Sequence, residues 1–346
     1  MSDAPRIIVT VQHPAHVHFF RNAITDLEAL GYDVCVFARE KDIACTLLDT
    51  YGIEYETLAG TASSPIGLAK TQAIYEYRIL SRVRALKPDV LLAIGEPAVA
   101  HASSLVGGQS IIFTDTEHAA VSNGITFPFA DLLCTPDAFW DDLGERHRVY
   151  SGFHELAYLH PDRFTPDPMI LEDLGESDNE QLVVLRLVSW NAAHDFGRSG
   201  IDGIETLINE LERGGATVLV TAEGQLPPSF ADREVDVPPH RMHDLLAAAD
   251  LFLGESATMA IESGLLGTPA LYVSDLQAGV LGELETKYRL LRWLSRRAGP
   301  TEIADHACGL LSVDDSTWSE RRRTVLEETI DTTQFIVDTV EEVARG

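Results

Sequence analysis

Three features are scarce in this chain: lysine, cysteine and long apolar runs. Only four of its 26 basic residues are lysine, 54 residues are acidic, and the formal net charge is −28. Because basic surfaces bind the phosphate backbone, this balance excludes nucleic acid as an expected partner. The four cysteines are scattered and form no CxxC pair. This pattern argues against a zinc–thiolate site or a disulfide framework, and it predicts buried, reduced thiols.

No run of about eighteen apolar residues occurs, so we expect no membrane-spanning helix, although peripheral contact with a membrane stays open. Residues 1–14 enter a strand directly and lack the basic segment and apolar core of a signal peptide. These two features predict a cytoplasmic protein.

Acidic residues, by contrast, are abundant. An acidic, lysine-poor surface stays hydrated in molar salt, where electrostatic interactions are screened within a few Å. The composition resembles that of cytoplasmic proteins from salt-accumulating halophiles, including archaea. We therefore expect the acidity to reflect the habitat more than the substrate.

The first half of the chain alternates between strand and helix patterns, an order typical of a doubly wound parallel sheet. Helices are predicted at 17–30, after a loop with the sequence HPAH, and at 65–86. Strands are predicted at 6–12, 32–38, 53–58, 90–94, 110–114 and 131–135, the last being the final strand of this half.

The second half repeats this α/β character after a proline-rich stretch at 159–168, which predicts a linker. At 346 residues the chain is long enough for two domains, at 1–158 and 169–325. The pattern predicts strands at 182–188 and 216–222, helices at 201–213 and 243–249, and one or two helices over 315–346.

The segment 250–273 reads as a strand, a tight turn, a helix and another strand, which favours a parallel sheet. Ser256 is placed to cap the helix, and we expect free backbone N–H groups at 257–259. A helix N-terminus of this kind binds phosphate. The alternative is an ordinary capped turn in which Glu262, too far into the helix to cap it, is a surface residue.

This segment resembles the donor-binding motif of GT-B glycosyltransferases and UDP-N-acetylglucosamine 2-epimerases. That motif runs from an aspartate and an apolar strand through a small-residue loop to a helix glutamate and Gly-x-Pro. The resemblance implies that Glu262 binds ribose hydroxyls and that six loop residues cradle the diphosphate of a nucleotide sugar. These six residues are Gly254, Glu255, Ser256, Ala257, Thr258 and Met259.

Three histidines follow the first predicted strand, at the sheet edge where ligands of doubly wound folds bind. His13 or His16 is a candidate for acceptor binding or acid–base catalysis, because neutral imidazole transfers protons near neutral pH. Capping and packing are the alternative. A metal site is less favoured, since no clear carboxylate or cysteine partner lies nearby. We expect His18 to be structural.

Glu96 and Glu117 each follow a predicted strand, so both are expected at the same sheet edge. Two carboxylates placed together can supply acid and base; alternatively, each caps a helix. In spacing, their loops resemble two acidic loops of the 2-epimerases, which implies a catalytic role for both glutamates. The sequence departs from that pattern at His118 and Ala119, and no later proline–glutamate pair occurs.

Arg186 interrupts an apolar strand that we expect to be central in the second domain. A buried arginine without an anion is costly, so this residue is a candidate phosphate clamp; an internally paired or snorkelling side chain is the alternative. At the same strand end, Trp190 is a candidate for donor binding. The neighbours His194 and Asp195 are candidates for orienting or protonating a donor phosphate.

In GT-B donor domains, the position of the segment 238–246 lies near the nucleotide base. This resemblance makes Met242 and His243 candidates for contact with the base. The alternative is a proline-started helix on which His243 is packed or exposed.

Six separated segments resemble a domain-of-unknown-function family of archaea and some bacteria, itself distantly similar to GT-B glycosyltransferases and the 2-epimerases. The resemblance implies two Rossmann-like domains with an interdomain cleft, and a C-terminal helix over 326–346 that packs back toward the first domain. The segments are HPAHVHFF, TDTEHA, SGFHELAYLHP, SWNAAHDFG, RMHDLLAAADLFLGESATMAIESGLLGTPA and GELETKYRLL.

We therefore predict a metal-independent glycosyltransferase without a cofactor, acting in surface glycan or glycolipid assembly. Its donor is a nucleotide sugar, with UDP-sugar as the first choice, and its acceptor is a sugar or a lipid-linked molecule. A helix dipole and an arginine can neutralise the leaving diphosphate in place of a metal. Two alternatives remain: a 2-epimerase, which needs no acceptor, and a non-catalytic nucleotide-sugar-binding protein.

Overall fold

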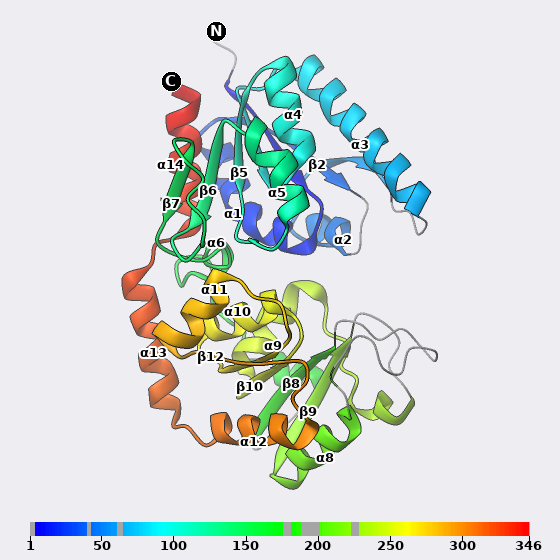
Figure 1. Cartoon of the computed structure of the whole chain (residues 1–346), viewed down its shortest axis with the longest axis vertical. Coiled ribbons are helices and arrows are strands. Elements are labelled where there is room, and N and C mark those ends of the chain that lie inside the picture. The colour runs from blue at the N-terminus through cyan, green and yellow to red at the C-terminus, as the bar shows by residue number, and fades with distance from the viewer. Residues whose placement is uncertain are drawn as a thin grey trace. The chain divides into compact units, whose positions relative to one another are not determined.

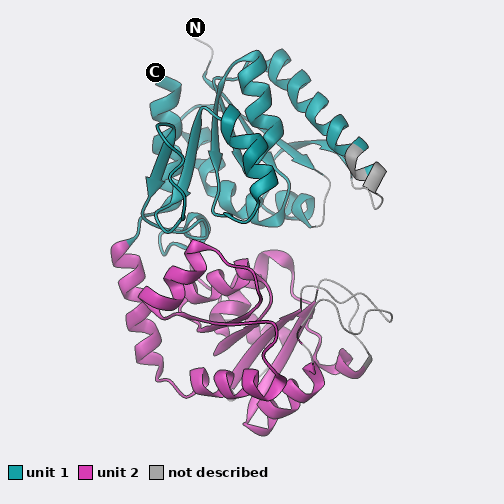
Figure 2. Ribbon diagram, viewed as in Figure 1, with its two compact units in different colours: residues 1–163, 329–346 teal, residues 164–328 magenta. Residues whose placement is uncertain are grey.

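The structure is a computed structural model that describes residues 4–39, 43–60, 65–175, 181–187, 201, 203–222 and 228–345. The chain divides into two compact units (Figure 2). The first unit comprises residues 1–163 and 329–346, and the second comprises residues 164–328. Each unit is built on a parallel sheet with helices against it (Figure 1).

The first sheet has seven parallel strands in the order β3-β2-β1-β4-β5-β6-β7. The direction of strand addition reverses between β1 and β4, which makes this pair the topological switch point of the sheet. The strands are β1 Arg6–Val11, β2 Asp33–Arg39, β3 Tyr55–Ala59, β4 Val90–Ile94, β5 Gln109–Phe113, β6 Leu132–Pro136 and β7 His147–Tyr150.

Helices of the first unit connect these strands or follow the last of them. They are α1 Pro14–Ala29, α2 Ala44–Thr50, α3 Pro65–Leu86, α4 Pro97–Val106, α5 Ala120–Thr126, the 3-10 helix η1 Phe127–Phe129, α6 Leu156–Leu159 and, from the end of the chain, α14 Thr332–Arg345. The hydroxyls of Thr332 and Thr333 donate to the carbonyls of Phe153 and Ala157, at 2.8 and 2.6 Å. These bonds hold the start of α14 against the segment that carries α6.

The second sheet has five parallel strands in the order β12-β11-β10-β8-β9, and its switch point lies between β8 and β10. Its strands are β8 Gln181–Leu187, β9 Ala216–Ala222, β10 Leu251–Gly254, β11 Ala270–Val273 and β12 Leu291–Leu294. The main helices are α7 Ile170–Leu174, α8 Ile204–Arg213, α9 Met242–Ala248, α10 Ala257–Leu266, α11 Gly279–Glu283, α12 Pro300–Leu311 and α13 Asp315–Glu328. Two short 3-10 helices, η2 Pro228–Arg233 and η3 Pro239–Arg241, and a short π-helix, η4 Leu284–Tyr288, also belong to this unit.

Apolar strands explain why both sheets lie inside their units. Strands β4 and β10 contain no polar side chain, and β1 is apolar and buried except for the partly exposed Arg6 and the buried Thr10. A parallel sheet covered by helices on both faces needs such continuous apolar runs. The two predicted parallel α/β folds are therefore confirmed.

Several details of the prediction are wrong. The stretch HPAH is not a loop, because Pro14 opens α1 and the helix includes His16. Proline suits the first helical position, where its missing N–H costs nothing. The stretch 131–135 is not the final strand, because β7 follows and pairs with β6 at the sheet edge. Finally, only Cys134 is buried as expected; Cys35 and Cys45 are partly exposed, and Cys308 is exposed.

Among the described residues, no helix has both the length and the apolar composition needed to cross a membrane.

Candidate functional site

The predicted site residues of the second unit gather at its switch point. Gly254 ends β10 and pairs in register with Arg186 on β8. A Cβ atom on residue 254 would lie 2.5 Å from the Arg186 carbonyl oxygen and 2.9 Å from the Arg186 Cβ. Glycine is therefore required for this close approach, which brings the loop after β10 onto the backbone of the partly buried Arg186.

The loop after β10 leads directly into α10. Ser256 occupies the N-cap, and its hydroxyl accepts from the backbone N–H of Met259 at 3.4 Å. The expectation that Met259 offers a free N–H is therefore wrong, because the capping side chain takes it. The N–H groups of Ala257 and Thr258 donate to no described residue. Residues 255–259 are partly exposed, so this positive helix end is open to an anion.

Glu262 is buried rather than a surface residue, with 5% of its area exposed. Its Oε1 lies 3.0 Å from Nε2 of His243, which is itself buried on α9. The structure thus joins two residues that were predicted separately, one for the ribose and one for the base. The rings of Phe164 and His243 form a T-shaped pair, with centroids 6.0 Å apart. Met242 opens α9 and is partly exposed.

The remaining predicted residues of this unit, Trp190, His194 and Asp195, lie outside the described residues.

In the first unit, the three histidines that follow β1 lie in different environments. His13 is exposed and caps α1, its Nδ1 accepting from the N–H of Ala15 at 3.2 Å. His16 is partly exposed, and its ring centroid lies 6.1 Å from that of His13. His18 is buried against the ring of Tyr158, in agreement with the structural role that we expect for it.

Glu96 lies across the same switch point, at the end of β4. Only 1% of its surface is exposed, and the hydroxyl of Tyr75 donates to its Oε2 at 3.1 Å. Its side chain makes no capping bond to α4, so the capping alternative is wrong for this residue. Burial raises the pKa of Glu96 from 4.5 to about 7, against smaller opposing effects of polar neighbours that include Gln12 and Tyr75.

Glu117 lies on the neighbouring loop after β5. It lines a pocket of about 410 Å³ together with α5, η1 and residues 141–146. Helix α5 connects the two acidic loops, because Ser122 donates to the carbonyl of Gly95 at 3.2 Å and Asn123 donates to that of Thr116 at 3.0 Å. Both acidic loops therefore lie at the same edge of the sheet, as predicted.

The Asp115–His154 pair was not predicted. Its Oδ2 and Nδ1 atoms lie 3.4 Å apart, and His154 is buried beside the ring of Tyr150. Burial lowers the pKa of His154, and the charge of Asp115 opposes that effect. Both residues fall within sequence segments that suggested the family, TDTEHA and SGFHELAYLHP, but their separation along the chain concealed the contact.

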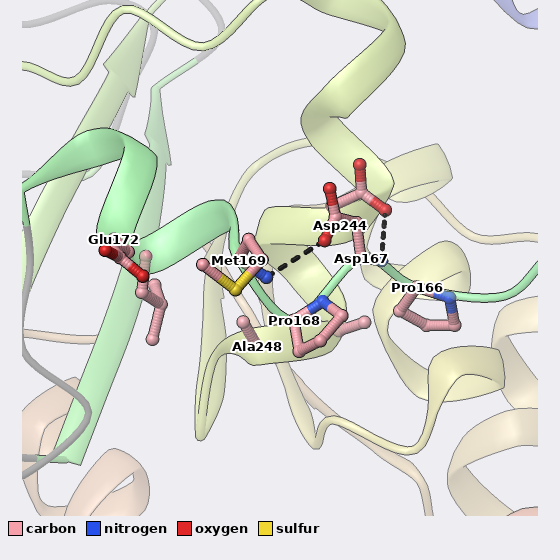
Figure 3. Close-up of a pocket in the computed structure, with 9 residues that line it drawn as sticks. Pro166, Asp167, Pro168, Met169, Glu172, Asp244 and Ala248 are labelled. Atoms are coloured by element: carbon pink, nitrogen blue, oxygen red, sulfur yellow. Dashed lines mark hydrogen bonds between the residues drawn. The ribbon is translucent and has the colours of Figure 1, made fainter.

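A further pocket of about 420 Å³ lies on the segment 166–172 and α9 (Figure 3). Asp167 and Asp244 lie together there, the N–H of Asp167 donating to Asp244 Oδ1 at 2.9 Å. Beside them, the Arg241 guanidinium donates to Asp167, Asp173 and Asp244 at 2.8–3.0 Å. This pocket contains none of the predicted nucleotide-binding residues, so we assign it no ligand.

Comparison with known proteins shows the family to which the chain belongs. Residues 6–345 match the family described as Protein of unknown function (DUF354), and the chain belongs to it. An uncharacterized protein of Methanocaldococcus jannaschii is 24% identical over 279 residues, which cover 75% of this chain and 79% of that protein.

Solved structures share the fold. Spinosyn forosaminyltransferase SpnP matches with a TM-score of 0.71 at 12% identity, covering 100% of both chains. The UDP-GlcNAc 2-epimerase of Neisseria meningitidis, solved with UDP-GlcNAc bound, matches with a TM-score of 0.67 at 12% identity, covering 97% of this chain and all of that one. The two parallel α/β units therefore have the fold of GT-B glycosyltransferases and these epimerases, as the sequence predicted.

Proposed function

We propose that the protein is a glycosyltransferase that takes its sugar from a nucleoside diphosphate sugar. One observation carries the proposal: the open N-terminus of α10 lies at the switch point of the second sheet, on the backbone of Arg186. The N–H groups of Ala257 and Thr258, the helix dipole and the guanidinium would neutralise the diphosphate as it leaves. This positive charge makes a metal-independent reaction chemically reasonable.

The buried pair Glu262–His243 would complete the donor site. A carboxylate held by a histidine has a fixed orientation, as a group that binds two ribose hydroxyls requires. Gly254 and Glu255 begin the diphosphate loop, and α10, which starts at the end of that loop, carries Glu262. The nucleotide would thus lie along the carboxyl edge of β10, with its ribose toward α9.

In the first unit, Glu96 is the preferred proton-transfer group. Its pKa of about 7 suits a residue that gains and loses a proton near neutral pH. His13, His16 and Glu117 are the other candidates for acceptor binding and catalysis.

The same carboxyl favours a second candidate function, a 2-epimerase. That reaction removes and returns the proton at C2 of the sugar, which a carboxyl with this pKa can do. Product analysis separates the two reactions. A C2 epimer formed from UDP-N-acetylglucosamine without acceptor would support the epimerase. Release of nucleoside diphosphate only when an acceptor is added, with no epimer, would support the transferase.

A thermal-shift screen against UDP, GDP, CDP, dTDP and their sugars tests the donor site. A ligand at about 100 times its Kd adds about 2.7 kcal/mol of stability, so we expect a rise of several degrees with one nucleotide. In Glu262→Gln, the affinity is expected to fall about 10-fold or more. Glu302→Gln, at an exposed position on α12, is the matched control. The non-catalytic binding protein becomes the better account if ligand binds but neither product forms.

A further inference from the structure

We infer that Tyr272 and Arg296, together with Glu255, form a subsite that recognises hydroxyl groups of the donor's sugar. This inference rests on the proposed function and extends it to two residues outside the predicted site. All three residues belong to the second unit.

Strand register places Tyr272 next to the diphosphate loop. On β11, Tyr272 pairs with Gly254 on one side and with Trp293 of β12 on the other. Its ring lies 6.3 Å from that of Trp293, whose indole N–H donates to the carbonyl of Ser274 at 2.7 Å. The phenol ring is therefore packed against Trp293, and strand pairing with Gly254 places it at the edge where the proposed donor binds.

Two buried polar atoms in this region have no hydrogen-bond partner among the described residues. One is the hydroxyl oxygen of Tyr272, a residue that is fully buried, and the other is Nε of Arg296. The backbone beside them is fixed, because the N–H of Arg296 donates to Asp275 at 3.3 Å. Buried polar atoms are rarely left without partners, since desolvation is not then compensated. Two such atoms in one region indicate that a ligand completes the bonding.

The charges around the phenol indicate the kind of ligand. Burial is the main cause that raises the pKa of Tyr272; the side-chain hydroxyl of Ser274 and the charge of Arg296 lower this pKa, and the charge of Glu255 raises it. The guanidinium and the carboxylate thus both act on the phenol. This set offers N–H and O–H donors together with a carboxylate acceptor. A sugar hydroxyl both donates and accepts, so it can bond to the donors and to the carboxylate, whereas a phosphate oxygen can only accept.

Calorimetric titration of UDP, UDP-glucose, UDP-galactose and UDP-N-acetylglucosamine tests the inference. We expect at least one UDP-sugar to bind the unmodified protein more tightly than UDP. Tyr272→Phe is expected to weaken that UDP-sugar about 3- to 10-fold, and Arg296→Gln about 10- to 100-fold. Neither variant is expected to change the affinity for UDP. Arg297→Gln, the exposed neighbour, is the matched control for the loss of one positive charge.

Each outcome decides a specific claim. Because the Tyr272 hydroxyl bonds to no described residue, Tyr272→Phe is expected to keep the melting temperature of the ligand-free protein. Equal loss of UDP and UDP-sugar affinity would contradict the sugar assignment. No loss of either affinity would also contradict it, and an ordered water bound to the two atoms would then explain why they lack a protein partner. In both cases, UDP binding that depends on Glu262 would leave the proposed function intact. If no nucleotide binds the unmodified protein, both proposals are wrong.

Discussion

Replacing Glu96 with glutamine is expected to stabilise the protein above neutral pH and to leave its stability unchanged in acid. Glutamine has the shape of protonated glutamic acid, and its amide oxygen can still accept from Tyr75, as Oε2 does at 3.1 Å. The substitution therefore removes a charge from a buried position without removing the hydrogen bond.

The magnitude follows from the pKa of about 7 in the folded protein, compared with 4.5 for an ordinary glutamate. Between these pH values the unfolded chain has lost a proton that the folded protein keeps, so stability falls as the pH rises through this interval. Above it, linkage gives a full loss of about 3 kcal/mol. Glutamine avoids this loss. For a unit of this size, the gain corresponds to a rise of about 6–12 °C in melting temperature.

Urea unfolding of both proteins at pH 5, 6, 7 and 8 measures the effect. The stability difference between them is expected to grow from pH 5 to pH 7 and to level off by pH 8, once Glu96 is ionised in the folded protein as well. Glu145→Gln, at an exposed position, is expected to show no such growth. A difference that stays flat from pH 5 to pH 8 would refute the reasoning, because Glu96 would then ionise as freely as a surface carboxyl. If Glu96 transfers a proton in the reaction, the same variant is expected to lose about 10²- to 10⁴-fold in turnover.

Two further predictions concern the packing of β10 and the charge of the whole chain. Gly254→Ala is expected to cost about 1–3 kcal/mol in urea unfolding and to weaken nucleotide binding, because its Cβ would lie 2.5 Å from the Arg186 carbonyl oxygen. Gly282→Ala, whose Cβ would meet nothing within 4 Å, is the control; similar behaviour of both variants would contradict the close approach. Raising KCl is expected to increase the melting temperature at pH 7.5, because it screens repulsion within a chain of net charge −28. The gain is expected to shrink near the calculated pI of about 4.6, and an equal gain at both pH values would show that self-repulsion is not the cause.

The segment around β10 and α10 could be predicted because its signals are local. An apolar strand, a serine cap, a helix and a Gly-Thr-Pro stop follow one another without interruption. The same holds for β1 and β4, whose apolar runs identify them as buried parallel strands. Strand β7 gave no such signal, because His147 and Arg148 are partly exposed at the sheet edge. Strand β12 was missed for the same reason, since Arg292 is exposed and Trp293 is partly exposed.

Contacts between distant residues could not be predicted from the sequence. His243 and Glu262 were each proposed as ligand contacts, but nothing in the pattern indicated that they bond to each other across α9 and α10. Tyr272 looked like any apolar strand residue, because the sequence cannot show that a buried hydroxyl lacks a partner. Arg296 lies in a short polar turn, and only the register of β11 and β12 brings that turn near the proposed site.

The most direct test of the central claim is a crystal structure of the protein with the nucleotide that the thermal screen identifies. We predict that the diphosphate lies within hydrogen-bonding distance of the N–H groups of Ala257 and Thr258, with the ribose hydroxyls at Glu262. A nucleotide bound elsewhere in the second unit, with the N-terminus of α10 occupied only by water, would contradict the account.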